Sequence, residues 1–148
     1  MEGMTVRPGV PEDVPFLISS FVESFCGTEF GAEVLRSVDR DGAKLFRSRL
    51  RDLWIAVLQH YEVRVMTPED DPSTIVGYLV SSGPVVAWVY TRAPSRQAGV
   101  ATALLEAAGF TKDRPLTCVF ARVATLTAAR RLGWVVRNNP FLALALPQ

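Results

Sequence analysis

The sequence holds few of the residues that metal sites, cross-linked secreted domains or membrane proteins need. Its 148 residues include two cysteines and one histidine, and Cys26 and Cys118 match no zinc or redox spacing. No run approaches the roughly 20 apolar residues of a membrane span, and no basic segment followed by an apolar one opens the chain. We therefore expect a cytoplasmic protein with two buried free thiols, no metal and no membrane partner.

An excess of charge of one sign is missing as well. The formal net charge is +1, which is too balanced to indicate nucleic-acid binding from bulk electrostatics. Hydrophobic residues make up 49% of the chain and charged residues 21%, as in globular rather than disordered proteins. Because no linker or repeat interrupts it, the chain is expected to form a single domain over residues 1–148.

Apolar periodicity and turn residues predict the order of helices and strands. Helices are indicated where apolar residues recur every three or four positions, and strands where short apolar or alternating runs lie between turns. Strands are predicted at 5–7, 61–66, 74–80, 85–91, 116–120, 134–137 and 141–146. Helices are predicted at 11–25, 43–59, 100–108 and 125–132. This order, βααβββαβαββ, indicates an α+β domain whose last two strands form a hairpin.

The stretch that says most about function is the loop Arg96-Gln97-Ala98-Gly99-Val100-Ala101, between a buried strand and a helix. A glycine lets the backbone approach an anion closely, because it has no Cβ. The first N–H groups of the helix lack intrahelical partners, and the helix dipole adds positive charge there. Such a loop can bind phosphate, with further charge from Arg96 and Arg92. An ordinary strand–turn–helix connection is the alternative.

The motif and its surroundings resemble the GNAT (GCN5-related N-acetyltransferase) superfamily across almost the whole chain. Arg96, Gly99 and Ala101 match the family pattern Arg/Gln-x-x-Gly-x-Gly/Ala. Further matches lie in the next helix, at the N-terminus and at the end of the last helix: Ala103-Leu104-Leu105, Arg7 with Asp13 and Leu17, and Leu132-Gly133-Trp134. The stretch from Trp88 to Pro94 also resembles GNAT-like proteins encoded by phages.

The resemblance implies a fold, a cofactor and a set of contacts. The fold would be a mixed, mostly antiparallel sheet of about six to seven strands flanked by about four helices. Acetyl-CoA would be the acyl donor, its pantetheine amides bound by backbone groups near Val89, Tyr90 and Thr91. The N–H groups from Gln97 to Thr102 would bind its pyrophosphate. A primary amine would attack the thioester directly in a ternary complex.

Two family residues are missing from the expected places. The tyrosine that protonates the departing thiolate would fall at Ala129, and an asparagine of the same helix would fall near Arg122. The catalytic residues are therefore unassigned. Candidates for a general base are His60, Tyr78, Tyr90, Glu23, Glu29 and Glu33. Of these, Glu29 and Glu33 lie in the predicted connection between the first two helices, where the family often contacts substrate.

Three functions remain open from the sequence. The first is an N-acetyltransferase acting on a small-molecule or protein amine, and the second is a weak or inactive GNAT-like module that works through protein or nucleic-acid contacts. The third is modification of a host protein or nucleobase, which would suit a basic stripe at Arg40, Lys44, Arg47 and Arg51. A solvated helix face also explains that stripe. The chain is expected to be a monomer, or a homodimer paired through its terminal hairpin.

Overall fold

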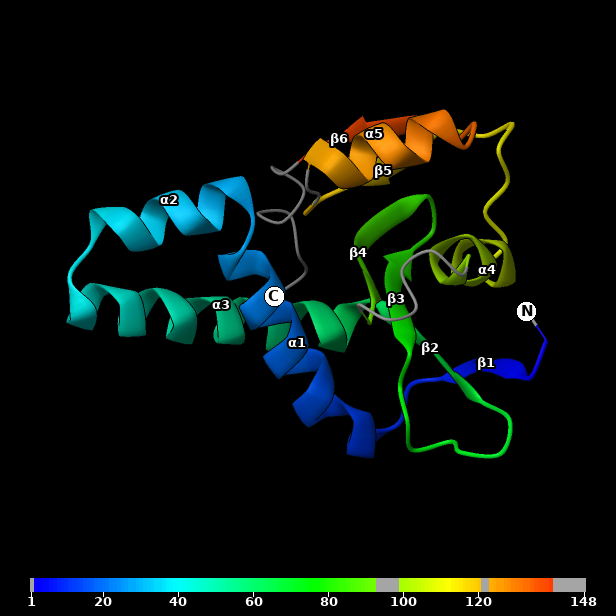
Figure 1. Ribbon diagram of the computed structural model, residues 1–148, viewed down its shortest axis with the longest axis horizontal. Coiled ribbons are helices and arrows are strands. Elements are labelled where there is room, and N and C mark those ends of the chain that lie inside the picture. Colours follow the sequence, from blue (N-terminus) through cyan, green and yellow to red (C-terminus); the bar gives the residue numbers. More distant parts are fainter. Residues whose placement is uncertain (1, 93–98, 121–122, 140–148) are drawn as a thin grey trace. The chain divides into compact units, whose positions relative to one another are not determined.

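The computed structural model describes residues 2–92, 99–120 and 123–139 and has the predicted α+β architecture (Figure 1). The chain divides into two compact units. The sheet unit comprises Met1–Gly9 and His60–Gln148, and the helical unit comprises Val10–Gln59. The prediction of a single domain stays a prediction, and each unit is described by itself.

The sheet unit contains one mixed sheet with its strands in sequence order. The described strands are β1 (Met4–Pro8), β2 (Glu62–Pro68), β3 (Gly77–Ser82), β4 (Val85–Thr91), β5 (Leu116–Cys118) and β6 (Val136–Asn138). Neighbours from β1 to β4 are antiparallel, whereas β4–β5 and β5–β6 are parallel. This six-stranded, mostly antiparallel sheet confirms the predicted fold class. The predicted strand 141–146, and with it the terminal hairpin, lies outside the described residues.

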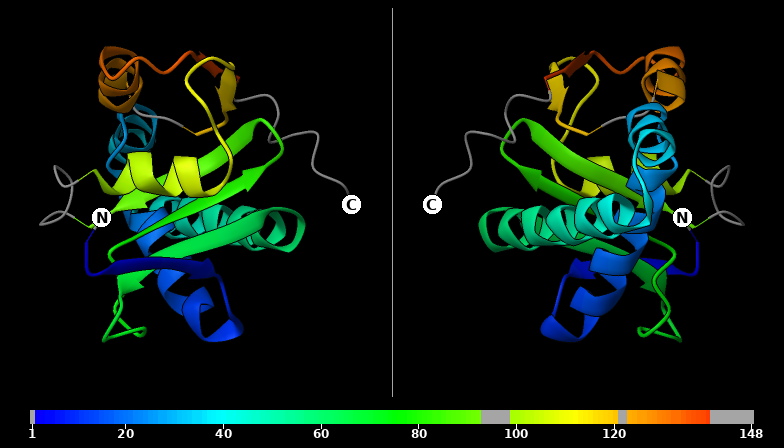
Figure 2. Two further views of the ribbon diagram at one scale, coloured as in Figure 1. Left: turned by 90° about the vertical axis from the view of Figure 1, so that its right-hand side faces the viewer. Right: turned by 90° about the vertical axis from the view of Figure 1, so that its left-hand side faces the viewer.

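The described part of the sheet unit contains two helices, and a glycine follows each of them closely. Helix α4 (Val100–Ala107) lies across one face of β2, β3 and β4 (Figure 2), and α5 (Val123–Arg131) packs beside β6. Their C-terminal stops, Gly109 and Gly133, have φ of 88° and 93°, a conformation that only glycine adopts easily. Buried residues of both helices and of the sheet form one core, which includes Met66, Leu79, Val100, Leu104, Leu116, Leu126, Trp134 and Val136.

Gly77 lets α4 approach the sheet closely. A Cβ at this position would lie 2.6 Å from Val100 Cγ1 and 2.8 Å from the carbonyl oxygen of Tyr90. Val100, at the first turn of α4, is completely buried. The N-terminus of α4 is therefore positioned by direct contact with the start of β3.

The helical unit contains a 3-10 turn (Pro11–Asp13), α1 (Val14–Cys26), α2 (Glu29–Ser37) and α3 (Arg40–His60), of which only the last residue, His60, falls in the sheet unit. Its core is aromatic. The rings of Phe21 and Trp54 stack with centroids 3.9 Å apart, and Trp54 Nε1 donates to the carbonyl of Leu17 at 3.0 Å. A buried indole whose N–H has an acceptor loses no hydrogen-bond energy on folding, so α1 and α3 are joined by both packing and a polar contact.

Helix α2 corrects the predicted element order. Three helices precede β2 instead of two, and the described chain has five α-helices instead of about four. The reason is local capping, because Thr28 Oγ1 accepts from the N–H of Gly31 at 3.1 Å. The next helix begins at Arg40 rather than residue 43, and there Asp39 Oδ1 accepts from the N–H of Gly42 at 2.7 Å. Side-chain caps of this kind fix helix starts, so the predicted connection is itself a helix.

Candidate functional site

The sheet opens between β4 and β5. Parallel pairing joins Val85 to Thr117 and Val86 to Cys118, and no further pair of these strands occurs among the described residues. Next to the last pair, the register between β3 and β4 shifts by one residue. Val86 opposes Ser81 and Trp88 opposes Val80, which leaves Ala87 as the extra residue of a β-bulge. The C-terminal half of β4 thus stays paired with β3 but is no longer paired with β5 in the described part of the chain.

The register decides which backbone groups of β4 face the opening. The N–H of Arg92 donates to the carbonyl of Val76 at 2.9 Å, which makes this a hydrogen-bonded pair. Because such pairs alternate along antiparallel strands, the backbone groups of Tyr90 face β3, and those of Val89 and Thr91 face the β5 side. Of the three residues predicted to contact pantetheine, two are oriented for it by their backbone and Tyr90 is not.

The N-terminus of α4 has the geometry of an anion site. Gly99 is its N-cap residue in the left-handed conformation, with φ of 76°, and among the described residues no side-chain cap is found for this helix. Its carbonyl accepts from the N–H of Ala103 at 3.0 Å, so the N–H groups of Val100, Ala101 and Thr102 precede the first intrahelical bond. The first turn also carries no acidic residue, which leaves the positive end of the dipole uncompensated.

These residues fit a pyrophosphate group. Gly99 is exposed, and a Cβ built on it would meet no atom of the described residues within 4 Å, so these residues leave room for an anion at the glycine. The side chain of Val100 is buried and only its N–H could contact a ligand, whereas Ala101 and Thr102 are half-buried. Arg96, Gln97 and Ala98 of the predicted loop lie outside the described residues.

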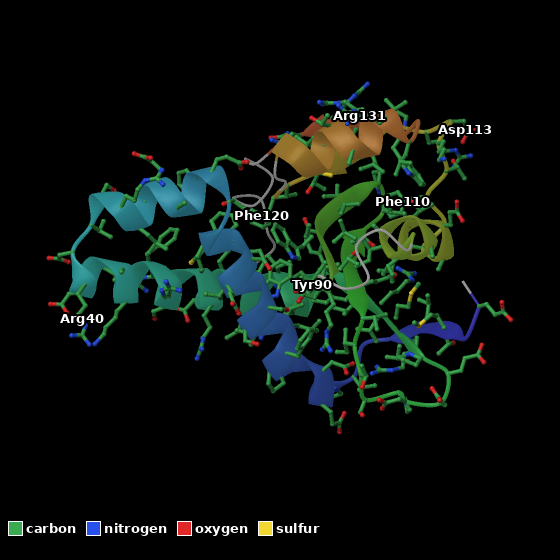
Figure 3. The ribbon with its side chains drawn as sticks, viewed as in Figure 1. Arg40, Tyr90, Phe110, Asp113, Phe120 and Arg131 are labelled. Atoms are coloured by element: carbon green, nitrogen blue, oxygen red, sulfur yellow. The ribbon has the colours of Figure 1, made fainter. Side chains whose placement is uncertain are left out.

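Aromatic residues beside the opening are stacked on one another. Tyr78 of β3 is completely buried, and its ring stacks on that of Tyr90 with centroids 5.1 Å apart. The half-buried Tyr90 lies on β4, where it is labelled in Figure 3. Complete burial keeps Tyr78 from contacting a substrate, so Tyr90 is the better candidate of the pair.

The other candidate bases lie on helices. His60 is the exposed last residue of α3, where a cation suits the helix dipole. Glu29 opens α2, and Glu33 forms an ion pair with Arg36 at 2.6 Å, both side chains being exposed. The prediction that Glu29 and Glu33 lie in a connecting loop is wrong. Both have ordinary helix-stabilising positions, and they lie one helical turn apart on the same helix.

Ala129, at the position where a general acid is expected, contributes to the hydrophobic core instead. Ala129 is half-buried on α5 and packs against the hydrophobic core of the sheet unit. Its carbonyl accepts from the N–H groups of Leu132 and Trp134, which close the end of the helix. A methyl side chain donates no proton, so the described part of α5 supplies no acid at this place. Arg122 lies outside the described residues.

Neither cysteine has the setting of a nucleophile. Cys26 is buried and Cys118 is half-buried, and both are free thiols. Burial raises the pKa of the Cys118 thiol to about 11, although the positive charge of Arg130 acts in the opposite direction. A thiol that stays protonated at neutral pH reacts poorly, which favours direct transfer over a covalent cysteine intermediate.

The described residues reveal no metal site and no membrane helix. No three His, Cys, Asp or Glu side chains within these ranges come together as metal ligands. Of the helices described, none is both long and apolar enough to cross a bilayer. The stripe Arg40, Lys44, Arg47 and Arg51 is exposed along α3, with Arg40 at the start of the helix in Figure 3.

Comparison with solved structures relates this fold to acetyltransferases. A GCN5-related N-acetyltransferase of Ralstonia eutropha superposes with a TM-score of 0.56 at 18% identity, covering 89% of this chain and 92% of the other. A Pyrococcus furiosus protein proposed to be an acetyl transferase has a TM-score of 0.55 at 14% identity, with 96% and 89% covered. A GCN5-related N-acetyltransferase of Rhodopseudomonas palustris gives 0.50 and 20%, with 74% and 65% covered.

No family model and no curated protein matches the sequence. This chain spans slightly less than two thirds of the Rhodopseudomonas protein. The matched structures come from bacteria and an archaeon, and nothing in them supports a phage origin.

Proposed function

We propose that this chain, which has the fold of the GNAT acetyltransferases, is an acetyl-CoA-dependent N-acyltransferase that acetylates a primary amine. The observation that carries the proposal is the combination of an opened sheet with an uncapped helix. Strand β4 leaves β5 after Val86, and the chain then reaches the N-terminus of α4 at Gly99. A long ligand with amides at one end and a pyrophosphate at the other matches these two features.

The described residues suggest how acetyl-CoA would be bound. The backbone groups of Val89 and Thr91 would pair with the pantetheine amides as an added strand does. The N–H groups of Val100, Ala101 and Thr102 would bind the pyrophosphate. When bound, acetyl-CoA supplies a thioester whose thiolate is a good leaving group. Positioning the acceptor amine against that thioester would supply much of the rate.

A second candidate is a GNAT-like module with weak or no catalysis, and Ala129 favours it. The methyl group of this residue packs on the core and offers no proton to a departing thiolate. The two candidates differ in turnover, and the second also predicts weak or absent CoA binding. An acetylation assay with a panel of small amines and basic peptides separates them, because the first predicts sustained turnover, whereas the second predicts little or no product above a no-enzyme control.

Calorimetric titration with acetyl-CoA and with CoA tests the cofactor site. Gly99→Glu would place bulk and negative charge at the end of α4 where the pyrophosphate is expected, and should abolish binding. Gly109→Glu is the matched control, because Gly109 also has positive φ, is exposed, and has open space around it at the other end of α4. Both variants carry a similar backbone strain of about 1 kcal/mol.

Micromolar binding by the wild type and by Gly109→Glu, lost in Gly99→Glu, would support the proposal. Equal loss in both variants would mean that the effect comes from backbone strain. A folded wild-type protein that binds neither acetyl-CoA nor CoA would reject the proposed function.

A further inference from the structure

The helical unit carries a concave surface that the proposed acetyl-CoA contacts do not use. It has a volume of about 580 Å³ and is formed by side chains of α1, α2 and α3. Three of the residues that line it carry charge, Glu23, Arg47 and Arg51. All three side chains are exposed at the rim, so a ligand could reach them from solvent.

The two arginines are free to bind an anion. Arg47 and Arg51 are one helical turn apart on α3 and therefore project from the same side. Neither has an ion-pair or hydrogen-bond partner in the described part of the chain. Two other arginines of this unit are paired, Arg49 with Asp52 at 3.8 Å and Arg36 with Glu33 at 2.6 Å, whereas Arg40 has no ion pair among the described residues. Two unpaired guanidinium groups that line one concavity offer cationic hydrogen-bond donors to a carboxylate.

Glu23 restricts which anion fits. Its carboxylate also has no ion-pair or hydrogen-bond partner among the described residues, so it lies in the same concavity without neutralising either arginine directly. A doubly charged phosphate would be repelled by this carboxylate, whereas a ligand with one carboxylate and one ammonium group would be attracted by all three side chains.

The remaining surface is apolar. Val22 and Cys26 of α1 and Leu35 of α2 line the same concavity, and the long stems of the arginines add aliphatic surface. A ligand with a branched aliphatic group could bury that group here, at roughly 25 cal/mol per Å² of apolar area covered.

We propose that this surface binds an amino-acid-like zwitterion with an apolar side chain. Its carboxylate pairs with Arg47 and Arg51, its ammonium group with Glu23, and its aliphatic group packs on Val22 and Leu35. The inference concerns the helical unit alone and does not depend on acetyl-CoA binding.

Three probes of similar shape test it by NMR titration of the full-length protein without acetyl-CoA. L-leucine has all three groups, 4-methylpentanoate lacks the amino group, and 3-methylbutylamine lacks the carboxylate. L-leucine should bind with a Kd on the order of 1 mM, as suits so small a ligand. The other two should bind about tenfold more weakly or not at all. Absence of saturable L-leucine binding up to about 10 mM overturns the proposal.

Variants identify the contacts. Arg47→Met and Arg51→Met keep the aliphatic stems and should each weaken L-leucine binding about tenfold, whereas Arg49→Met, on the same helix but paired with Asp52, should leave it unchanged. Glu23→Gln should remove the preference for L-leucine over 4-methylpentanoate. If Arg49→Met weakens binding as much as Arg47→Met, or if Glu23→Gln keeps the preference, the assignment of the site is wrong. Unchanged amide spectra of each variant confirm that it is folded.

Discussion

At the scale of single residues, the Cys118 thiol decides whether a covalent intermediate is available to this chain. Burial raises its pKa to about 11, so at pH 8 the thiolate fraction is roughly 0.1%, against about 10% for a thiol with a pKa near 9. We expect alkylation of Cys118 in the folded protein to be about 100-fold slower at pH 8 than in the unfolded protein. Mass spectrometry of timed iodoacetamide reactions, resolved by peptide, measures this.

The pH dependence gives the control for this prediction. In the folded protein the alkylation rate of Cys118 should keep rising with pH until about 11, since the protonated form is favoured below that pKa. In urea the rate should level off near pH 9. A folded-state rate that levels off near 9 would contradict the desolvation of the thiol and reopen the question of a cysteine nucleophile.

The hydroxyl of Thr67 gives a second prediction at this scale. Its oxygen is fully buried and has no hydrogen-bond partner within the described residues. Leaving a buried hydroxyl unsatisfied costs about 1–3 kcal/mol, so Thr67→Val should keep the free energy of unfolding or raise it by about 1 kcal/mol. Urea denaturation of the wild type and the variant measures this free energy of unfolding. Thr5→Val is the control, because Thr5 opposes Thr67 across the strands but is exposed. A lower free energy of unfolding for Thr67→Val alone would show that the Thr67 hydroxyl has a hydrogen-bond partner and would contradict the prediction.

Some properties of single residues could be predicted from the sequence, and others could not. Gly99 was predicted to leave room for an anion, and its left-handed N-cap conformation and open surroundings agree with this. The burial of Val100 and Tyr78 was not predicted, because burial depends on which elements pack together and not on the local pattern. Arg96, the charged residue of the motif, lies outside the described residues, so its role stays a prediction.

At the scale of elements, the contact between α4 and β3 positions the candidate site. Gly77→Ala would bring a Cβ to 2.6 Å from Val100 Cγ1 and 2.8 Å from the carbonyl oxygen of Tyr90. Overpacking of this kind typically costs about 1–3 kcal/mol, and relief requires α4 or β4 to move. We therefore expect lower stability in urea and, if the proposed function is right, weaker acetyl-CoA binding by calorimetry.

A double-mutant cycle separates the two clashes. Val100→Ala removes Cγ1 and creates a cavity, yet it should be less harmful in the Gly77→Ala background than in the wild type, because it relieves part of the overlap. Strict additivity of the two free-energy changes would mean that the structure adapts without moving α4. The cost of Gly77→Ala measured in the Val100→Ala background reports the remaining clash with the Tyr90 carbonyl.

The elements themselves were predicted unequally well. Helices and antiparallel strands with a clear apolar period, such as 100–108 and the hairpin of β2 and β3, are confirmed. Helix α2 was missed although its signal was present, since Thr28 and Asp39 are capping residues and the stretch between them was assigned to a connection. The parallel pairing of β6 with β5 could not be predicted from local pattern, because strand partners are chosen by the tertiary structure.

At the scale of the whole molecule, the order of elements was enough to predict the fold class, whereas the division into two units was not predicted. The helical unit interrupts the sheet unit between β1 and β2, so the chain leaves the sheet and returns to it. Along the sequence the predicted helices and strands follow one another without a linker, and the amino-acid composition does not change at residues 10 or 60. Whether the two units unfold together is therefore a question for experiment.

The three tryptophans can answer it, because Trp54 lies in the helical unit and Trp88 and Trp134 lie in the sheet unit. If residues 1–148 form a single cooperative domain, the three indole N–H signals in NMR spectra should disappear at the same temperature. Acetyl-CoA at about 100 times its Kd adds about 2.7 kcal/mol to the free energy of unfolding, which corresponds to a rise in Tm of roughly 5–10 °C. The temperature at which each of the three signals disappears should rise by that amount, and Gly99→Glu should abolish this rise. A Trp54 signal that disappears separately and ignores acetyl-CoA would instead establish the helical unit as an independently folding domain.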